Sequence, residues 1–66
     1  MKVSVINQGR KQEVEVQKNS SVLDLLKKIQ VNPETVLVGK NGEIVPETEQ
    51  LRERDKIELI RVISGG

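Results

Sequence analysis

Two stretches of alternating apolar and polar residues open the chain. Residues 2–7 place Val3 and Val5 on one side, and residues 12–17 do the same with Val14 and Val16. Strict alternation of this kind is typical of a half-buried strand. Because only a short polar turn containing one glycine separates the two stretches, we predict an antiparallel hairpin.

A helical period replaces the alternation after residue 20. The apolar residues Val22, Leu25, Leu26 and Ile29 recur at helical spacing and form one stripe. Ser21 is a favourable N-cap, and Asp24 follows three residues later, near the positive end of the helix dipole. Proline disfavours helical geometry in the residue before it, so Pro33 places the end of the helix before Asn32. The pattern predicts a helix over residues 22–30.

The next stretch predicts a second, shorter hairpin. Residues 34–39 are expected to form a third strand, and residues 44–45 a brief return strand that Pro46 ends. Asn41-Gly42 between them tolerates the positive φ angles of a type I′ turn. Residues 47–55 form a charged connection in which only Leu51 is apolar, and we expect Leu51 to close the open end of the core.

The chain finishes with an aliphatic strand followed by a stretch of small residues. Residues 56–63 are rich in β-branched and aliphatic side chains, and Ser64, Gly65 and Gly66 follow. Two glycines pack no side chain and have the freest backbone, which suits presentation of a terminal carboxylate to a narrow site. The alternative is an ordinary loose terminus, since termini are often rich in small residues.

Taken together, the elements run hairpin, helix, short hairpin, loop and strand. A helix covering one face of a sheet is the economical arrangement for this order. We therefore predict an α+β, β-grasp fold with a mixed sheet of four to five strands and one helix packed on one face. Residues 1–66 are expected to form a single domain with a flexible tail over residues 64–66. A last strand lying centrally beside the first would hold the root of that tail firmly.

Composition narrows the classes of function. Of the 66 residues, 32% are charged, and the near balance of charge, at a net +1, argues against nucleic-acid or membrane partners. The chain has no Cys and no His, so it lacks a thiolate nucleophile, a cysteine zinc site and the commonest general base. We expect a cytoplasmic monomer that is not an enzyme and holds no cofactor or metal.

Two segments resemble a known family. The hairpin VLVGKNGEIVP over residues 36–46 resembles that of the thiamin-pathway carriers, and the ending DKIELIRVISGG over residues 55–66 is similar to theirs. The whole chain looks like a ubiquitin-like β-grasp protein of the sulfur-carrier kind, a group that includes the molybdopterin-synthase small subunit and the archaeal small modifier proteins. The hairpin favours the thiamin type over the molybdopterin type. A departure is Ser64, where the family often has Ala.

The resemblance implies how the chain is used. An adenylating enzyme that uses ATP would activate the carboxylate of Gly66. Gly65, which has no side chain, would allow the C-terminal residues to enter a narrow channel of that enzyme. The activated carboxylate would then become a thiocarboxylate, by way of a sulfur donor and a sulfur-accepting synthase, or would form an isopeptide bond with lysines of target proteins. The residues leave three readings open: carrier, modifier or both.

Alternation in the last strand also predicts a docking surface. With Ile57 and Leu59 in the core, Ile60 and Val62 fall on the opposite face, near Arg61, Ile63 and Ser64 at the root of the tail. Leu37 alternates with Val36 and Val38 in the predicted third strand, so it can lie on the same outer face as Ile60 and Val62. Exposed aliphatics beside a reactive terminus suggest contact with the activating enzyme. The alternative is that Ile60 and Val62 are only strand-forming residues on a half-covered face.

Two further features have weaker interpretations. Lys40 follows the third strand at a turn, which makes it the most accessible candidate to accept another copy's tail, although lysines commonly serve solubility alone. Glu47, Glu49, Glu53 and Asp55 lack the spacing of a calcium loop and are read as a solvated connection. The rival function of another class is a β-grasp binding module that never uses its C-terminus.

Overall fold

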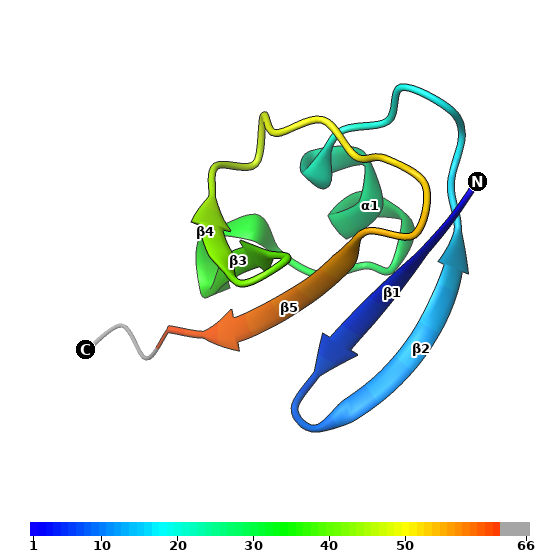
Figure 1. The fold of residues 1–66 in the computed structure, drawn as a ribbon. Coiled ribbons are helices and arrows are strands. Elements are labelled where there is room, and N and C mark those ends of the chain that lie inside the picture. The colour runs from blue at the N-terminus through cyan, green and yellow to red at the C-terminus, as the bar shows by residue number, and fades with distance from the viewer. Residues whose placement is uncertain (63–66) are drawn as a thin grey trace.

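A five-stranded mixed sheet with one helix on one face makes up the fold (Figure 1). The computed structural model describes residues 1–62. The elements in chain order are β1 Lys2–Asn7, β2 Arg10–Glu15, α1 Val22–Lys28, the 3-10 helix η1 Pro33–Thr35, β3 Val36–Lys40, β4 Glu43–Val45 and β5 Lys56–Arg61. The predicted α+β, β-grasp arrangement is confirmed, with five strands as its sheet.

The last strand lies in the centre of the sheet. The spatial order is β2-β1-β5-β3-β4, so β5 pairs in parallel with β1 and antiparallel with β3. The prediction that the final strand runs beside the first is therefore confirmed. Strands held on both sides make backbone hydrogen bonds along both edges, which makes β5 a firm support for whatever follows it.

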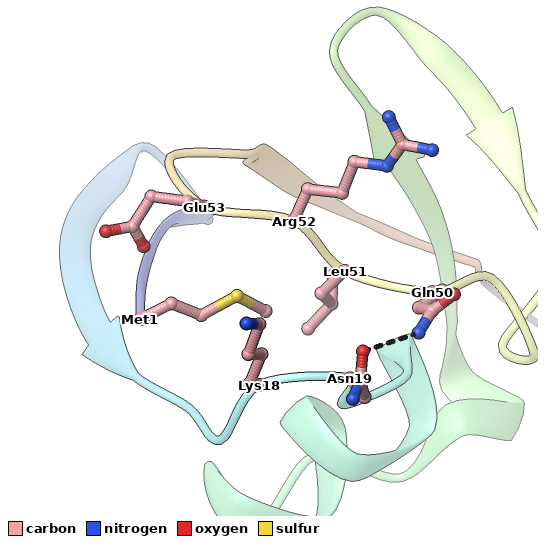
Figure 2. Close-up of a pocket in the computed structure, with 7 residues that line it drawn as sticks. All are labelled: Met1, Lys18, Asn19, Gln50, Leu51, Arg52 and Glu53. Carbon is pink, nitrogen blue, oxygen red and sulfur yellow. Dashed lines mark hydrogen bonds between the residues drawn. The ribbon is translucent and has the colours of Figure 1, made fainter.

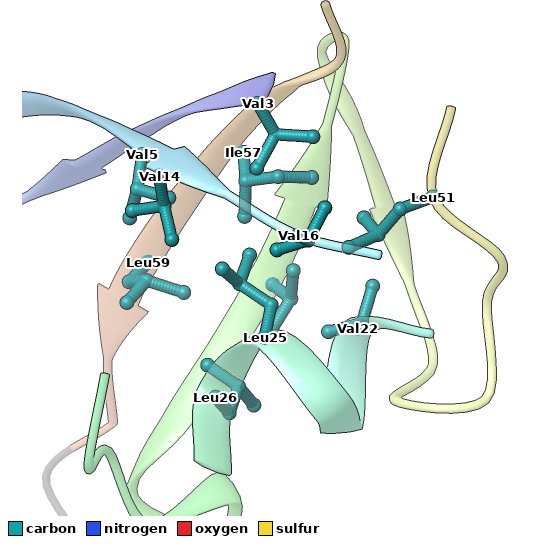
Figure 3. Packing of buried hydrophobic residues seen from close by; sticks show 11 residues of the cluster. Val3, Val5, Val14, Val16, Val22, Leu25, Leu26, Leu51, Ile57 and Leu59 are labelled. Carbon is teal, nitrogen blue, oxygen red and sulfur yellow. The ribbon is translucent and has the colours of Figure 1, made fainter. Parts of the chain in front are cut away.

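The core lies between the helix and the inner face of the sheet (Figure 3). Leu25 and Leu26 of α1 are fully buried, as are Val3, Val5 and Ile57 of the strands. Leu51 enters from the connection between β4 and β5 and is also buried. The prediction that Leu51 closes one end of the core is confirmed.

The first hairpin has a shorter turn than predicted. Gln8 and Gly9 both have positive φ, at 54° and 80°, and Asn7 pairs directly with Arg10. A two-residue turn of this kind matches the right-handed twist of the strands, so β2 begins and ends two residues earlier than expected. Val16 lies beyond β2 but is still buried, and its N–H donates to the Met1 carbonyl at 2.8 Å.

The helix ends two residues before its predicted end. Gln30 takes a left-handed φ of 61°, and its N–H donates to the Lys27 carbonyl at 3.2 Å, while the Val31 N–H donates to Leu26 at 2.9 Å. These are the paired bonds of a Schellman motif, which closes a helix. The usual residue at the left-handed position is glycine, so the sequence carried no clear stop signal here.

The third strand begins later than predicted, because residues 33–35 form η1. The Asn32 side chain accepts a hydrogen bond from the Glu34 N–H at 2.9 Å, and Pro33 occupies the first position of the turn. β3 therefore covers Val36–Lys40 instead of residues 34–39. Beyond it, Asn41 and Gly42 have φ of 52° and 91°, which confirms the predicted two-residue turn.

Candidate functional site

The central strand carries the chain to the root of the predicted tail. β5 ends at Arg61, and the Val62 N–H still donates to the Thr35 carbonyl at 3.0 Å. The backbone is thus held in place up to Val62. Ile63, Ser64, Gly65 and Gly66 lie outside the described residues, so the role assigned to Gly65 and Gly66 stays a prediction.

The outer face of the sheet, away from α1, collects the exposed aliphatic side chains. In the described part of the chain the exposed large hydrophobics are Leu37 at 48%, Ile44 at 59%, Ile60 at 41% and Val62 at 43%. Leu37 and Ile60 are direct cross-strand partners, and Val62 continues the alternation of Ile60. We call these four residues the apolar face. The structure thus brings three predicted docking residues together.

Ile44 is the member of the apolar face that sequence reasoning missed. It pairs with Gly39, which has the same parity as Leu37 and therefore lies on the outer face. The signal was present in the Asn41-Gly42 turn. A two-residue turn pairs Lys40 with Glu43. The next pair away from the turn is then Gly39 with Ile44.

Arg61 does not join the apolar face. It pairs with Val36 and shares the parity of Leu59, so its side chain leaves the sheet on the helix side. There it lines a cleft of about 310 Å³ together with Gln30 and Asn32. Arg61 therefore lies near the same end of β5 as Ile60 and Val62 but on the other face of the sheet.

Lys40 is not an accessible lysine, contrary to the prediction. Its side chain is only 15% exposed, and its Nζ lies 2.8 Å from Glu49 Oε2 and 3.8 Å from Asp55 Oδ2. The Nζ also donates to the Gln50 carbonyl at 3.3 Å. The cause is the packing of the β4–β5 connection against the second hairpin, which sequence alone did not show.

The same packing corrects the reading of residues 47–55 as a wholly solvated connection. Asp55 is 6% exposed, and its carboxylate accepts hydrogen bonds from the Arg52 N–H at 2.7 Å and the Asn41 amide at 3.1 Å. Asn41 in turn accepts from the Lys56 N–H at 3.0 Å. These bonds tie the turn of the second hairpin to the start of β5, and so link the two strands that carry most of the apolar face.

Two exposed carboxylates elsewhere have shifted acidities. A backbone hydrogen bond from Ser21 lowers the pKa of Asp24, in a capping box in which the Asp24 N–H also donates to Ser21 Oγ at 3.3 Å. The N-terminal ammonium of Met1, 2.8 Å away, lowers the pKa of Glu15. Both lie away from the apolar face and serve the fold.

Residues 1–62 hold no group of three or more His, Cys, Asp or Glu side chains placed to bind a metal ion. Within that same range, no helix has the length and apolar character needed to cross a membrane.

Comparison with known proteins identifies the family. Residues 3–66, nearly the whole chain, match the ThiS family. The chain belongs to the ThiS family. The resemblance to ubiquitin-like β-grasp sulfur carriers is therefore confirmed.

Individual relatives agree with membership of the ThiS family. The chain is 34% identical over 62 residues to the sulfur carrier protein TtuB of Thermus thermophilus, covering 94% of this chain and 95% of the relative. SAMP1 from Haloferax volcanii has the same fold, with a TM-score of 0.78, 19% identity and full coverage of both chains. A Caldiarchaeum subterraneum ubiquitin has a TM-score of 0.76 and 26% identity, covering 100% of this chain and 98% of that one.

Proposed function

We propose that this ThiS-family chain is a sulfur carrier whose working group is the carboxylate of Gly66. The observation that carries the proposal is the extent of the family match, which runs through Gly65 to Gly66. The similarity to a protein named sulfur carrier over nearly the full length of both chains supports it. The chain acts as a substrate of its partners.

The chemistry requires a partner that uses ATP, because a free carboxylate is a poor acyl donor. A carboxylate oxygen attacks the α-phosphorus of ATP, pyrophosphate leaves, and an acyl-adenylate forms at Gly66. Hydrosulfide released by the sulfur donor then attacks the carbonyl carbon, AMP leaves with the electron pair and the S–H proton goes to solvent, so that the chain ends as a thiocarboxylate. Since the chain has neither Cys nor His, the activating enzyme supplies the ATP site and the sulfur donor supplies the nucleophile.

The position of β5 supports this use of the terminus. The backbone is fixed by pairing on both sides of β5 and by the Val62–Thr35 bond, and four residues of the sequence follow Val62. Four residues reach at most ~14 Å when extended. The partner's active site must therefore come close to the end of the sheet, and the apolar face of Leu37, Ile44, Ile60 and Val62 lies there to receive it.

The test is ATP–pyrophosphate exchange with a candidate adenylating enzyme. Wild type should stimulate exchange, whereas a chain lacking Gly65 and Gly66, or one extended by an alanine after Gly66, should not. Glu13→Gln, at the far strand β2, is the matched control and should behave as wild type. With a sulfur donor added, mass spectrometry should find one oxygen replaced by sulfur at the C-terminus. Exchange that persists without the two glycines would exclude the proposal.

Protein modification is the second candidate, favoured by the 26% identity to a protein described as a ubiquitin. In that case the activated Gly66 would be joined to lysines of other proteins. Trypsin would cut after Arg61 and leave residues 62–66 attached to the acceptor lysine, which is a recognisable mass. A binding module that ignores its terminus would yield neither this remnant nor a thiocarboxylate.

A further inference from the structure

Two surfaces of the described chain differ in how sharply they select a partner. A pocket of about 500 Å³ opens at the Met1 end of the molecule, where the side chains of Met1 and Leu51 project into it (Figure 2). Lys18, Arg52 and Glu53 also line this pocket, so it carries charges of both signs and no ligand class follows from them. The apolar face is more selective, because a single unpaired charge lies against its aliphatic side chains.

Glu58 is the charged residue that borders the apolar face. It lies on β5 two residues before Ile60, so the two side chains leave the sheet on the same side. Across the sheet it pairs with Ile6 of β1 and with Gly39 of β3, and Gly39 pairs in turn with Ile44. Glu58 therefore has aliphatic neighbours in three directions on the outer face.

Gly39 makes Ile44 and Glu58 neighbours on this surface. A Cβ at Gly39 would lie 3.9 Å from Glu58 Cβ, but glycine has none, so no side chain of β3 stands between the two residues. At ~4.8 Å between neighbouring strands, Ile44 and Glu58 are roughly 10 Å apart. A partner that covers Ile44 and Ile60 must therefore cover Glu58 as well.

The Glu58 carboxylate has no partner of its own in the described part of the chain. Glu58 is exposed, and within residues 1–62 its side chain makes no ion pair or hydrogen bond, although Lys56 precedes it by two residues on the same face. Covering an ionised carboxylate with apolar groups is costly unless the covering surface supplies a donor. A surface that binds the apolar face must therefore bring a cation to Glu58.

We propose that Glu58 is a specificity-determining residue of the apolar face, and that it accepts hydrogen bonds from an arginine side chain of the activating enzyme. A guanidinium group is always charged and binds both oxygens of a carboxylate at once. The apolar stem of the arginine packs on Ile60 and Ile44 while its head reaches the carboxylate. The inference rests on the proposed function in one respect, that an adenylating enzyme uses Gly66.

The distance of Glu58 from the tail favours that enzyme as the partner. Val62 lies four residues beyond Glu58, roughly 13 Å at ~3.3 Å per residue along the strand direction. An enzyme that takes Gly66 into its active site must approach the Val62 end of the sheet. A standard interface of ~800 Å² per partner is about 28 Å across, so one that begins at Val62 and follows the apolar face includes Glu58.

The test measures ATP–pyrophosphate exchange by a candidate adenylating enzyme at increasing concentrations of the chain. Glu58→Gln should raise KM about tenfold and leave kcat unchanged, because the lost ion pair contributes to binding alone. Glu58→Lys, which sets two cations against each other, should raise KM ~100-fold or more. Salt should raise the KM of wild type more steeply than that of Glu58→Gln.

The matched control is Glu13→Gln, which makes the same change of charge on the same outer face but on the edge strand β2. It should keep the wild-type KM. Glu58→Gln removes no contact within residues 1–62, so its thermal melt should match that of wild type. A lowered melt together with a lowered kcat would show a structural role and overturn the proposal.

Direct binding separates failure of this inference from failure of the proposed function. The chain without Gly65 and Gly66 keeps the apolar face, and Glu58→Gln should weaken its binding to the enzyme about tenfold in isothermal titration calorimetry. Without exchange by wild type the proposed function would be refuted, and this binding measurement would still decide the role of Glu58. Exchange with one KM for Glu58→Gln and Glu13→Gln would overturn that role alone. So would a dimer in sedimentation equilibrium, which would place a second copy of the chain on the apolar face.

Discussion

Asp55 is the residue whose replacement should best test the account of how the second hairpin is joined to β5. Its buried carboxylate accepts from the Arg52 N–H and the Asn41 amide and lies 3.8 Å from the Lys40 ammonium. Asp55→Ala would leave these donors without the acceptor that they have in the folded protein. Removing one partner of a buried charged group typically costs ~3–5 kcal/mol.

That cost is large for a domain of this size. Typical stabilities of ~0.05–0.15 kcal/mol per residue give roughly 3–10 kcal/mol for 66 residues. The substitution should therefore remove about half of the free energy of unfolding. A change of 1 kcal/mol shifts Tm by about 4–8 °C in so small a domain, so the expected fall in Tm is about 12–40 °C.

The assay is urea unfolding followed by far-ultraviolet circular dichroism, with Glu47→Gln as the exposed control in the same connection. A double-mutant cycle of Asp55→Ala with Asn41→Ala should show a coupling of about 0.5–3 kcal/mol, because the two side chains share a hydrogen bond. An Asp55→Ala variant within ~0.5 kcal/mol of wild type, the range of ordinary surface changes, would refute the reasoning.

Three other outcomes follow from the same packing. Leu59→Ala should lower the free energy of unfolding by ~2–5 kcal/mol, measured by thermal melts, because Leu59 lies in the core. Ile60→Ala should leave the melt nearly unchanged yet weaken binding to the activating enzyme. The reverse ranking of the two melts would mean that the two faces of β5 are wrongly assigned. Ser21→Ala should cost about 1 kcal/mol in urea unfolding through loss of the N-cap, and an unchanged midpoint would contradict the capping box. Since the folded state lowers the pKa of Asp24, its contribution is present above the unfolded pKa and is lost as pH falls through the folded pKa; acid titration of stability should show this loss in wild type but not in Asp24→Asn, which has no carboxylate to titrate.

The elements with a strong local signal were predictable. The Asn41-Gly42 turn, the Ser21 cap and the alternation around Val3 and Val14 each depend on residues close in sequence. Two of the boundaries that were wrong, those of the first turn and of the helix, involve residues that adopt an unusual conformation without the usual residue type. Gln8 and Gln30 both take positive φ, where glycine or asparagine is the common choice, and this shortened a turn and ended a helix early.

The residues of the candidate site were likewise predictable where a local pattern placed them, and were not predictable where distant contacts did. Period-two alternation was enough to place Ile60 and Leu37 on the outer face, and the turn register would have added Ile44. Arg61 was included among the docking residues because it lies near the tail in sequence, and the structure places its side chain on the helix side. The failure at Lys40 has a different cause, since Glu49 and Asp55 meet it only after the connection folds back over the hairpin.

By itself, then, the sequence determined the kind of elements, their order, the apolar residues of the core and the resemblance to the sulfur-carrier family. All of these depend on residue type and on spacings shorter than one element. Only the tertiary structure decided that Lys40 is buried in ion pairs, that Asp55 joins the second hairpin to β5, and that Met1, Lys18 and Leu51 surround a pocket. Those features bring together residues 9 to 50 positions apart, and such contacts depend on how the layers pack because local pattern carries no information about which distant side chains will meet.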